Sequence, residues 1–120
     1  MKKVSILLVL GAILLAGACK SSSNNGYNPP TPPVVIQTSY SVDITGMAFS
    51  PSVITVPQNS LVVWTNRDQV VHTVTSTSGP LVFDSGNLNP NGVYSVDFLS
   101  PGTYDYKCLI HGFTGQVIVQ

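Results

Sequence analysis

A strand pattern and a pair of metal-ligating side chains meet in the segment Gly102-Thr103-Tyr104-Asp105-Tyr106-Lys107-Cys108-Leu109-Ile110-His111. Through residues 103–107, tyrosines alternate with polar side chains, and this period of two is typical of a β-strand with one buried face. Cys108 and His111 follow directly as a Cys-x-x-His pair, and both residue types bind transition metals. The segment therefore predicts a packed sheet and a metal site at the end of one of its strands.

Strand-like runs recur elsewhere in the chain. Residues 61–65, 93–98 and 116–120 alternate in period two, residues 70–75 form a β-branched run, and Gly, Pro, Asn and Ser separate these runs. No stretch combines the 3.6-residue period of a helix with helix end signals. We therefore expect an all-β fold over residues 38–120, with about seven or eight short strands forming a β-sandwich.

Charge is scarce in this chain, and the two signs balance. Charged residues make up 8% of the sequence, against about 25% in typical globular proteins, and the formal net charge is zero. A neutral chain lacks the basic surface with which nucleic-acid-binding proteins hold phosphates, so we expect no nucleic-acid partner. The two cysteines are too few for a disulfide scaffold and form no Cys-x-x-Cys motif.

The first residues have the pattern of an export signal. Two lysines precede an uncharged, apolar run over residues 4–18, which is shorter than the length of about 20 residues that a membrane-spanning helix needs. The run ends in Ala16-Gly17-Ala18-Cys19, which resembles the bacterial lipobox, whose cysteine is lipidated and becomes the mature N-terminus. We expect residues 1–18 to be a signal peptide and Cys19 to carry the lipid. Ordinary cleavage near Ala18 with soluble secretion is the alternative.

Residues 19–37 are expected to form a tether. Ser, Asn and Gly make up residues 21–26, and Pro-Pro-Thr-Pro-Pro at residues 29–33 favours an extended polyproline II conformation. An ordered first strand is the alternative, for which only residues 34–36 are apolar enough. Together these features predict that the domain of residues 38–120 is exported and lipid-anchored to a bacterial membrane, facing the periplasm or the cell exterior.

The metal-ligating side chains of the predicted domain are His72, Cys108 and His111. Two imidazoles and one thiolate are the ligand set of trigonal copper sites that transfer electrons, because thiolate suits Cu+ and imidazole suits Cu2+. A single cysteine in a core is more often a small apolar residue, and zinc accepts the same donors together with a water. Both histidines of the chain and the only cysteine of the domain fall into this one pattern, so we expect copper, as Cu+ or Cu2+, to be the cofactor.

From Tyr40 onwards the domain resembles the cupredoxins of the plastocyanin, pseudoazurin and amicyanin type. The matching motifs stand in the order that the family has: Met47-Ala48-Phe49-Ser50-Pro51, Val63-Trp64-Thr65-Asn66, His72-Thr73-Val74, Phe83-Asp84-Ser85-Gly86, Gly102-Thr103-Tyr104-Asp105-Tyr106, Cys108-Leu109-Ile110-His111 and Gly115-Gln116-Val117. The resemblance implies an eight-stranded Greek-key β-sandwich with one copper ion at one end. It also implies that His72, Cys108 and His111 are the copper ligands.

One stretch departs from the family pattern. The family continues His-Pro-Gly-Met-x-Gly-x-Val and uses the Met sulfur as a weak axial ligand, whereas this chain continues His111-Gly112-Phe113-Thr114-Gly115-Gln116-Val117. The loop is one residue shorter, and Phe113, which cannot coordinate a metal, falls where the Met would align. Gln116, Met47, a backbone carbonyl such as that of Val71, water, or no axial ligand at all remain open.

Some residues beside the predicted ligands have an open role. Thr73 stands where the family uses a polar side chain to tie the two ligand loops together, an arrangement that orients metal ligands. A plain strand threonine is the alternative. Asp68 and Asp84 are expected to be turn residues.

The expected function is to carry single electrons between redox protein partners while attached to a membrane through the lipid. Copper storage, delivery or sensing without electron transfer is the alternative. We do not expect an enzyme, because no Ser-His-Asp set and no carboxylate pair accompanies the histidines. A binuclear copper centre would need a second bridging cysteine, which the domain lacks.

Overall fold

The structure is a computed structural model that describes residue 26, residues 29–34 and residues 36–120. The secondary structure of this part of the chain consists of strands, which confirms the all-β prediction. Among the described residues there is no helix with the length and hydrophobicity to cross a membrane. The strands are β1 (Ser39–Ile44), β2 (Phe49–Ser50), β3 (Val53–Val56), β4 (Ser60–Asn66), β5 (Thr75–Ser78), β6 (Val93–Phe98), β7 (Gly102–Lys107) and β8 (Thr114–Val119).

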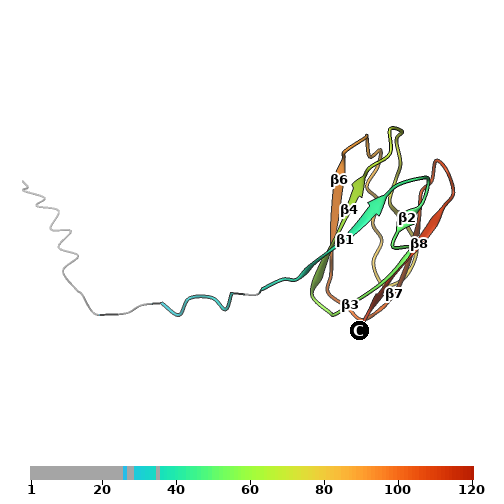
Figure 1. The fold of residues 1–120 in the computed structure, drawn as a ribbon. Coiled ribbons are helices and arrows are strands. Elements are labelled where there is room, and N and C mark those ends of the chain that lie inside the picture. Colours follow the sequence, from blue (N-terminus) through green and yellow to red (C-terminus); the bar gives the residue numbers. More distant parts are fainter. Residues whose placement is uncertain (1–25, 27–28, 35) are drawn as a thin grey trace, which may run out of the picture. The chain divides into compact units, whose positions relative to one another are not determined.

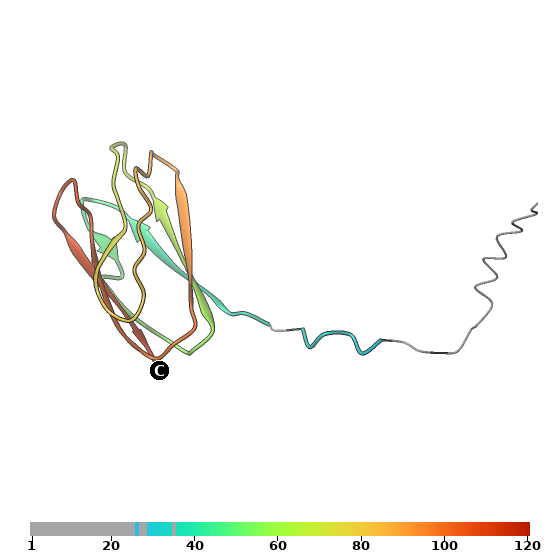
Figure 2. The same ribbon diagram turned by 180° about the vertical axis from the view of Figure 1, so that it is seen from behind.

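The strands form two four-stranded sheets that face each other as a sandwich (Figures 1 and 2). One sheet has the order β2-β1-β4-β6 and the other the order β3-β8-β7-β5. The pairs β1–β4 and β3–β8 are parallel, and the remaining pairs are antiparallel. The chain therefore crosses repeatedly between the two layers, which gives the cupredoxin-like sandwich that the sequence predicted.

The core between the sheets is rich in aromatic side chains. Trp64 of β4 is fully buried, and its ring meets that of Tyr106 of β7 edge-on at a centroid distance of 5.3 Å. Burial raises the pKa of Tyr106 to about 12, and the nearby Trp64 indole N–H offsets part of this rise. Gly115 lies opposite Tyr106 in the β7–β8 pair, where a Cβ atom would overlap the tyrosine ring. A glycine is therefore needed where the aromatic core meets β8.

The two ends of the sandwich can be told apart by the residues that lie there. Ser39 at the start of β1 pairs with Leu61 of β4, which pairs with Asp97 of β6, and the amide of Gln37 donates to the Asp97 carboxylate at 2.6 Å. We call this the distal end, which lies at the bottom of Figure 1 near the C-terminus. Since β7 runs away from it, Cys108 lies at the opposite end, which we call the ligand end.

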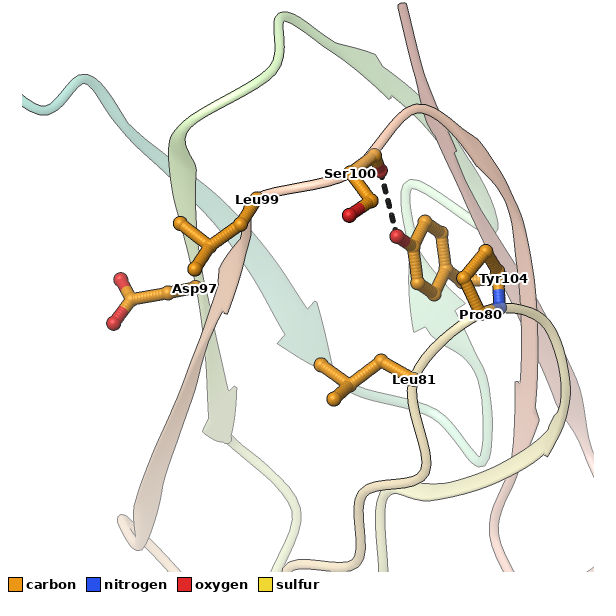
Figure 3. Close-up of a pocket in the computed structure, with 6 residues that line it drawn as sticks. All are labelled: Pro80, Leu81, Asp97, Leu99, Ser100 and Tyr104. Carbon is orange, nitrogen blue, oxygen red and sulfur yellow. Dashed lines mark hydrogen bonds between the residues drawn. The ribbon is translucent and has the colours of Figure 1, made fainter.

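A pocket lies at the distal end, between the loop after β5 and the turn that joins β6 to β7 (Figure 3). Two of its lining residues are linked by a hydrogen bond, in which the Tyr104 hydroxyl donates to the Ser100 carbonyl at 2.6 Å. The lining residues are Pro80, Leu81, Asp97, Leu99, Ser100 and Tyr104. None of them is a histidine or cysteine, so this pocket is separate from the predicted metal ligands.

The structure corrects one predicted strand. Residues 70–74 are not part of a regular strand, and only Thr75 begins β5. Two of their backbone groups bind side chains instead: the Asn66 side-chain amide donates to the Val70 carbonyl at 2.8 Å, and the Val74 N–H donates to the Ser85 hydroxyl at 2.8 Å. The β-branched residues favour extended backbone, but no neighbouring strand pairs with them.

On the outer face of the second sheet, Asp105 of β7 accepts two hydrogen bonds. The Ser78 hydroxyl of β5 donates at 2.6 Å, and the Gln116 amide of β8 donates at 2.7 Å. These bonds, that from Ser78 first, lower the pKa of Asp105 below its ordinary value of 3.8. One carboxylate thus links three adjacent strands.

We expect Asp105→Asn to destabilise the domain at neutral pH and to have little effect in strong acid. Because the pKa of Asp105 is lower in the folded than in the unfolded state, its contribution is complete above the unfolded value of 3.8 and is lost as the pH falls through the folded value. Urea unfolding of the wild type and the variant across this range measures the difference. In Ser78→Ala the pH-dependent part should shrink without vanishing, since Gln116 still donates. A difference between wild type and Asp105→Asn that is the same at every pH would contradict this account.

Candidate metal centre

Cys108 and His111 lie in a short loop between β7 and β8, at the ligand end. The Cys108 N–H donates to the Phe113 carbonyl at 2.9 Å, and the Gly112 N–H donates to the Cys108 carbonyl at 2.8 Å. Gly112 has a φ of 78°, a left-handed conformation that glycine adopts without strain. These contacts close the loop on itself, with the Cys108 side chain buried and His111 exposed.

His72 reaches the same place from the irregular segment before β5. Its N–H donates to the Leu88 carbonyl at 3.1 Å and its carbonyl accepts from the Leu88 N–H at 2.8 Å, as an isolated bridge. The imidazole is fully buried. Its Nδ1 atom lies 3.1 Å from Nδ1 of His111 and 3.7 Å from Sγ of Cys108, and the remaining Sγ–Nδ1 distance to His111 is 3.8 Å. The structure thus brings together the three residues that the sequence predicted.

These distances suit a transition metal. In a triangle with sides of 3.1, 3.7 and 3.8 Å, the point equidistant from the three atoms lies about 2.1 Å from each, close to the bond lengths of about 2.0–2.3 Å that imidazole nitrogen and thiolate sulfur make to such a metal. A metal ion could therefore contact all three atoms without a rearrangement of the loops. Cys19, predicted as a lipidation site, lies outside the described residues.

Asp68 orients the imidazole of His72 through a contact at Nε2, the ring nitrogen that faces away from Cys108 and His111. Its Oδ2 atom lies 2.9 Å from His72 Nε2, and a carboxylate can only accept, so Nε2 carries the proton. Nδ1 then has its lone pair directed towards Cys108 and His111, which is the tautomer that binds a metal. The sequence predicted only a turn role for Asp68, although its position four residues before His72 was visible.

The same carboxylate holds the turn between β1 and β2. It accepts from the N–H groups of Gly46 at 2.7 Å and Met47 at 3.0 Å, two residues with positive φ angles of 61° and 59°. The bonds from Met47 and Gly46 are the main causes that lower the pKa of Asp68, with a further contribution from His72. Asp68 therefore ties the β1–β2 turn to the imidazole of His72.

Thr73 ties the two segments that carry the candidate ligands. Its N–H donates to Cys108 Sγ at 3.4 Å, and its hydroxyl oxygen accepts from the Leu109 N–H at 2.8 Å. The hydroxyl oxygens of Thr73 and Thr75 lie 3.1 Å apart, and the Thr75 hydroxyl donates to Asp84 at 3.0 Å. The expectation that Thr73 links the two loops is confirmed, and Asp84 belongs to the same network.

Comparison with known protein families agrees with this geometry. A family model described as a cupredoxin-like domain matches residues 7–119. The chain belongs to this family. Its membership, together with the His72–Cys108–His111 cluster, confirms the prediction that copper is the cofactor.

Two characterised relatives are amicyanins. Amicyanin-alpha of Methylorubrum extorquens is 40% identical over 83 residues, which cover 66% of this chain and 70% of the relative. Amicyanin of Paracoccus denitrificans is 32% identical over 83 residues, which cover 66% of this chain and 63% of the relative. The chain therefore spans slightly less than two thirds of the Paracoccus protein.

Solved structures extend the similarity. An amicyanin variant in the Cu(I) state superposes with a TM-score of 0.65 at 30% identity, covering 68% of this chain and 82% of the variant. A Cu-containing nitrite reductase from Thermus scotoductus superposes with a TM-score of 0.63 at 26% identity, covering 71% of this chain and 22% of the reductase. The same sandwich thus occurs as a separate protein and as part of a larger chain.

We expect Asp68→Ala to lower copper affinity about 10- to 100-fold, because His72 loses the acceptor that sets its tautomer and orientation. Competition with a chelator of known copper affinity measures this change. Asp43→Ala is the matched control, since Asp43 is an exposed carboxylate of β1 that pairs with Arg67 at 3.3 Å and does not contact the imidazole. Equal affinities of the two variants would refute an orienting role for Asp68.

Proposed function

We propose that this protein is a membrane-tethered carrier of single electrons in which His72, Cys108 and His111 hold one copper ion. The observation that supports it most directly is the triangle of two Nδ1 atoms and one Sγ atom, whose centre lies at metal-bonding distance from all three. Copper, when bound, supplies the one-electron change between Cu+ and Cu2+. The protein supplies a donor set that suits both oxidation states.

The surroundings of the donors favour a site that changes little between the two states. Cys108 and His72 are fully buried. The imidazole of His72 donates to the Asp68 carboxylate, and the sulfur of Cys108 accepts from the Thr73 N–H. The hydrogen bond from the Leu109 N–H to the Thr73 hydroxyl fixes the position of the loop that carries Cys108 and His111. Donor atoms fixed by such contacts lose little energy to rearrangement, and rapid electron exchange needs this property.

The surface around His111 suits a protein partner. His111 is exposed, and Leu109 and Ile110 on the same loop are 56% and 51% exposed. Exposed apolar groups that cluster beside a functional group are typical of interaction sites. We propose that a redox protein docks here and that electrons pass through the exposed edge of His111. This arrangement supports a carrier more than an enzyme, since His72 and Cys108 are fully buried and His111 is the exposed candidate ligand.

The proposed anchor would attach at the other end of the molecule. Residues 1–18 as signal peptide, lipidated Cys19 and a tether over residues 19–37 are proposals from the sequence alone. They are compatible with the fold, because the chain joins β1 at the distal end and His111 lies at the ligand end.

Replacing Cys108 with Ser is expected to abolish the intense thiolate-to-copper absorption of the copper-loaded protein, because serine is a poorly ionised oxygen donor. The visible spectrum of wild type and Cys108→Ser at equal copper loading measures this loss. Thr75→Ser, which keeps a hydroxyl beside the site, serves as the control and should retain the band. Persistence of the band in Cys108→Ser would overturn the ligand assignment.

Voltammetry of the same wild-type sample separates the carrier from copper storage or delivery. A carrier gives a reversible one-electron wave at constant copper content. Loss of copper during the redox cycle would favour storage or delivery instead.

Mass spectrometry of the protein extracted from membranes is expected to show a chain that begins at Cys19 and carries a lipid-sized mass increment. The Ala16-Gly17-Ala18-Cys19 pattern is the reason for this expectation. Cys19→Ser removes the acceptor thiol and should release the domain from the membrane fraction or leave the signal uncleaved. An unmodified soluble product that starts at another residue would refute the anchor.

A further inference from the structure

The described residues also bear on the missing axial ligand. We propose, on the basis of the proposed copper site, that copper has three protein ligands and that the ring of Phe113 closes the side where cupredoxins usually place a methionine. The sequence left Gln116, Met47, a carbonyl, water or no ligand open. The contacts of Phe113, Gln116 and Met47 argue against an axial side-chain ligand.

The three donor atoms can hold a metal by themselves. A point about 2.1 Å from His72 Nδ1, His111 Nδ1 and Cys108 Sγ exists, within the range of about 2.0–2.3 Å that nitrogen and sulfur ligands make to such a metal. In copper sites with two imidazoles and one thiolate, an axial ligand is long and weak where it is present. The side chains around the triangle therefore decide whether there is a fourth ligand.

Phe113 is packed against both imidazoles. Its ring centroid lies 5.1 Å from that of His72 at an interplanar angle of 78° and 6.5 Å from that of His111 at 17°. On its other side it meets Phe49 at 4.7 Å, and Phe49 meets Tyr106 at 4.6 Å. The ring is thus held between the core and the candidate ligands, and it has no atom that can coordinate a metal.

Gln116 is directed elsewhere. In the β7–β8 pair it lies opposite Asp105, and its side-chain amide donates to the Asp105 carboxylate at 2.7 Å on the outer face of the sheet. Its neighbours Gly115 and Val117 are buried, whereas Gln116 is only partly buried. Because side chains alternate along a strand, Gln116 points away from the core.

The backbone of Met47 lies next to Nε2 of His72, on the side of the ring opposite the candidate metal position. Its N–H is bound to the same Asp68 oxygen that lies 2.9 Å from His72 Nε2, so its backbone lies behind the imidazole, away from Nδ1. The Met47 side chain is 47% exposed. A thioether that bound the metal would have to pass around the ring that Asp68 holds in place.

A site closed in this way should have a raised reduction potential. An axial sulfur would donate charge to the metal and stabilise Cu2+ more than Cu+, and that contribution is absent. The Phe113 ring also excludes water from the doubly charged ion. Both effects favour Cu+, so they act in the same direction.

The test compares copper-loaded wild type with Phe113→Met, Phe113→Leu, Met47→Leu and Gln116→Leu by voltammetry and visible absorption. Phe113→Met should lower the potential by at least about 59 mV, a tenfold shift in the preference for Cu2+ over Cu+, and should change the absorption spectrum. Phe113→Leu keeps an apolar group without a donor and should stay closer to the wild type. Met47→Leu and Gln116→Leu should leave both readouts unchanged.

Each contrary result has a distinct meaning. A large shift in Met47→Leu or Gln116→Leu would identify that side chain as the axial ligand and overturn the proposal. Identical potentials of Phe113→Met and Phe113→Leu would show that residue 113 does not face the metal, which also overturns it. A crystal structure of the copper-loaded wild type with a carbonyl or water at bonding distance would do the same. If the wild type lacks thiolate-to-copper absorption, the proposed function itself fails, and the failure is recognised before any variant is compared.

Discussion

Two segments of the chain, 36 residues apart, have to meet at one sulfur atom. Thr73 joins them twice, through its N–H to Cys108 Sγ and through its hydroxyl to the Leu109 N–H. This junction fixes the segment that carries His72 relative to the loop that carries Cys108 and His111. The surrounding structure places both segments: Cys108 directly follows the end of β7, and the bridge with Leu88 holds His72 close to the loop between β7 and β8.

A second layer of contacts makes the junction rigid. Asp68 connects the β1–β2 turn, the loop after β4 and the imidazole of His72 through one carboxylate. Phe113 connects the ligand loop to the aromatic core through Phe49. The candidate ligands are therefore positioned by groups from several elements, and such outer contacts orient metal ligands and raise the affinity for the metal. In a small domain such contacts combine structural and functional roles.

The two ends of the sandwich differ in the groups that they contain. The distal end receives the N-terminal segment at Gln37 and Ser39, and it contains the pocket around Tyr104. The ligand end contains the exposed His111 and its apolar neighbours Leu109 and Ile110.

The sequence by itself determined the all-β fold and the set of candidate metal ligands, for local reasons. Alternation is a property of each strand alone, so residues 93–98 and 103–107 were recognised with nearly correct limits. A Cys-x-x-His pair is equally local. His72 joined the set because the chain contains only two histidines, His72 and His111, and a single domain cysteine.

The tertiary structure decided the features that depend on long-range partners. Residues 70–74 are as β-branched as a strand, yet their hydrogen bonds go to loops and to a sulfur atom, and no pattern within the segment reveals those partners. Asp68 looked like a turn residue because its contact with His72 depends on how the chain folds back on itself. Gln116 was a possible ligand until the β7–β8 register turned it towards Asp105. In each case the side chain has several possible partners, and only the packing of distant segments selects one.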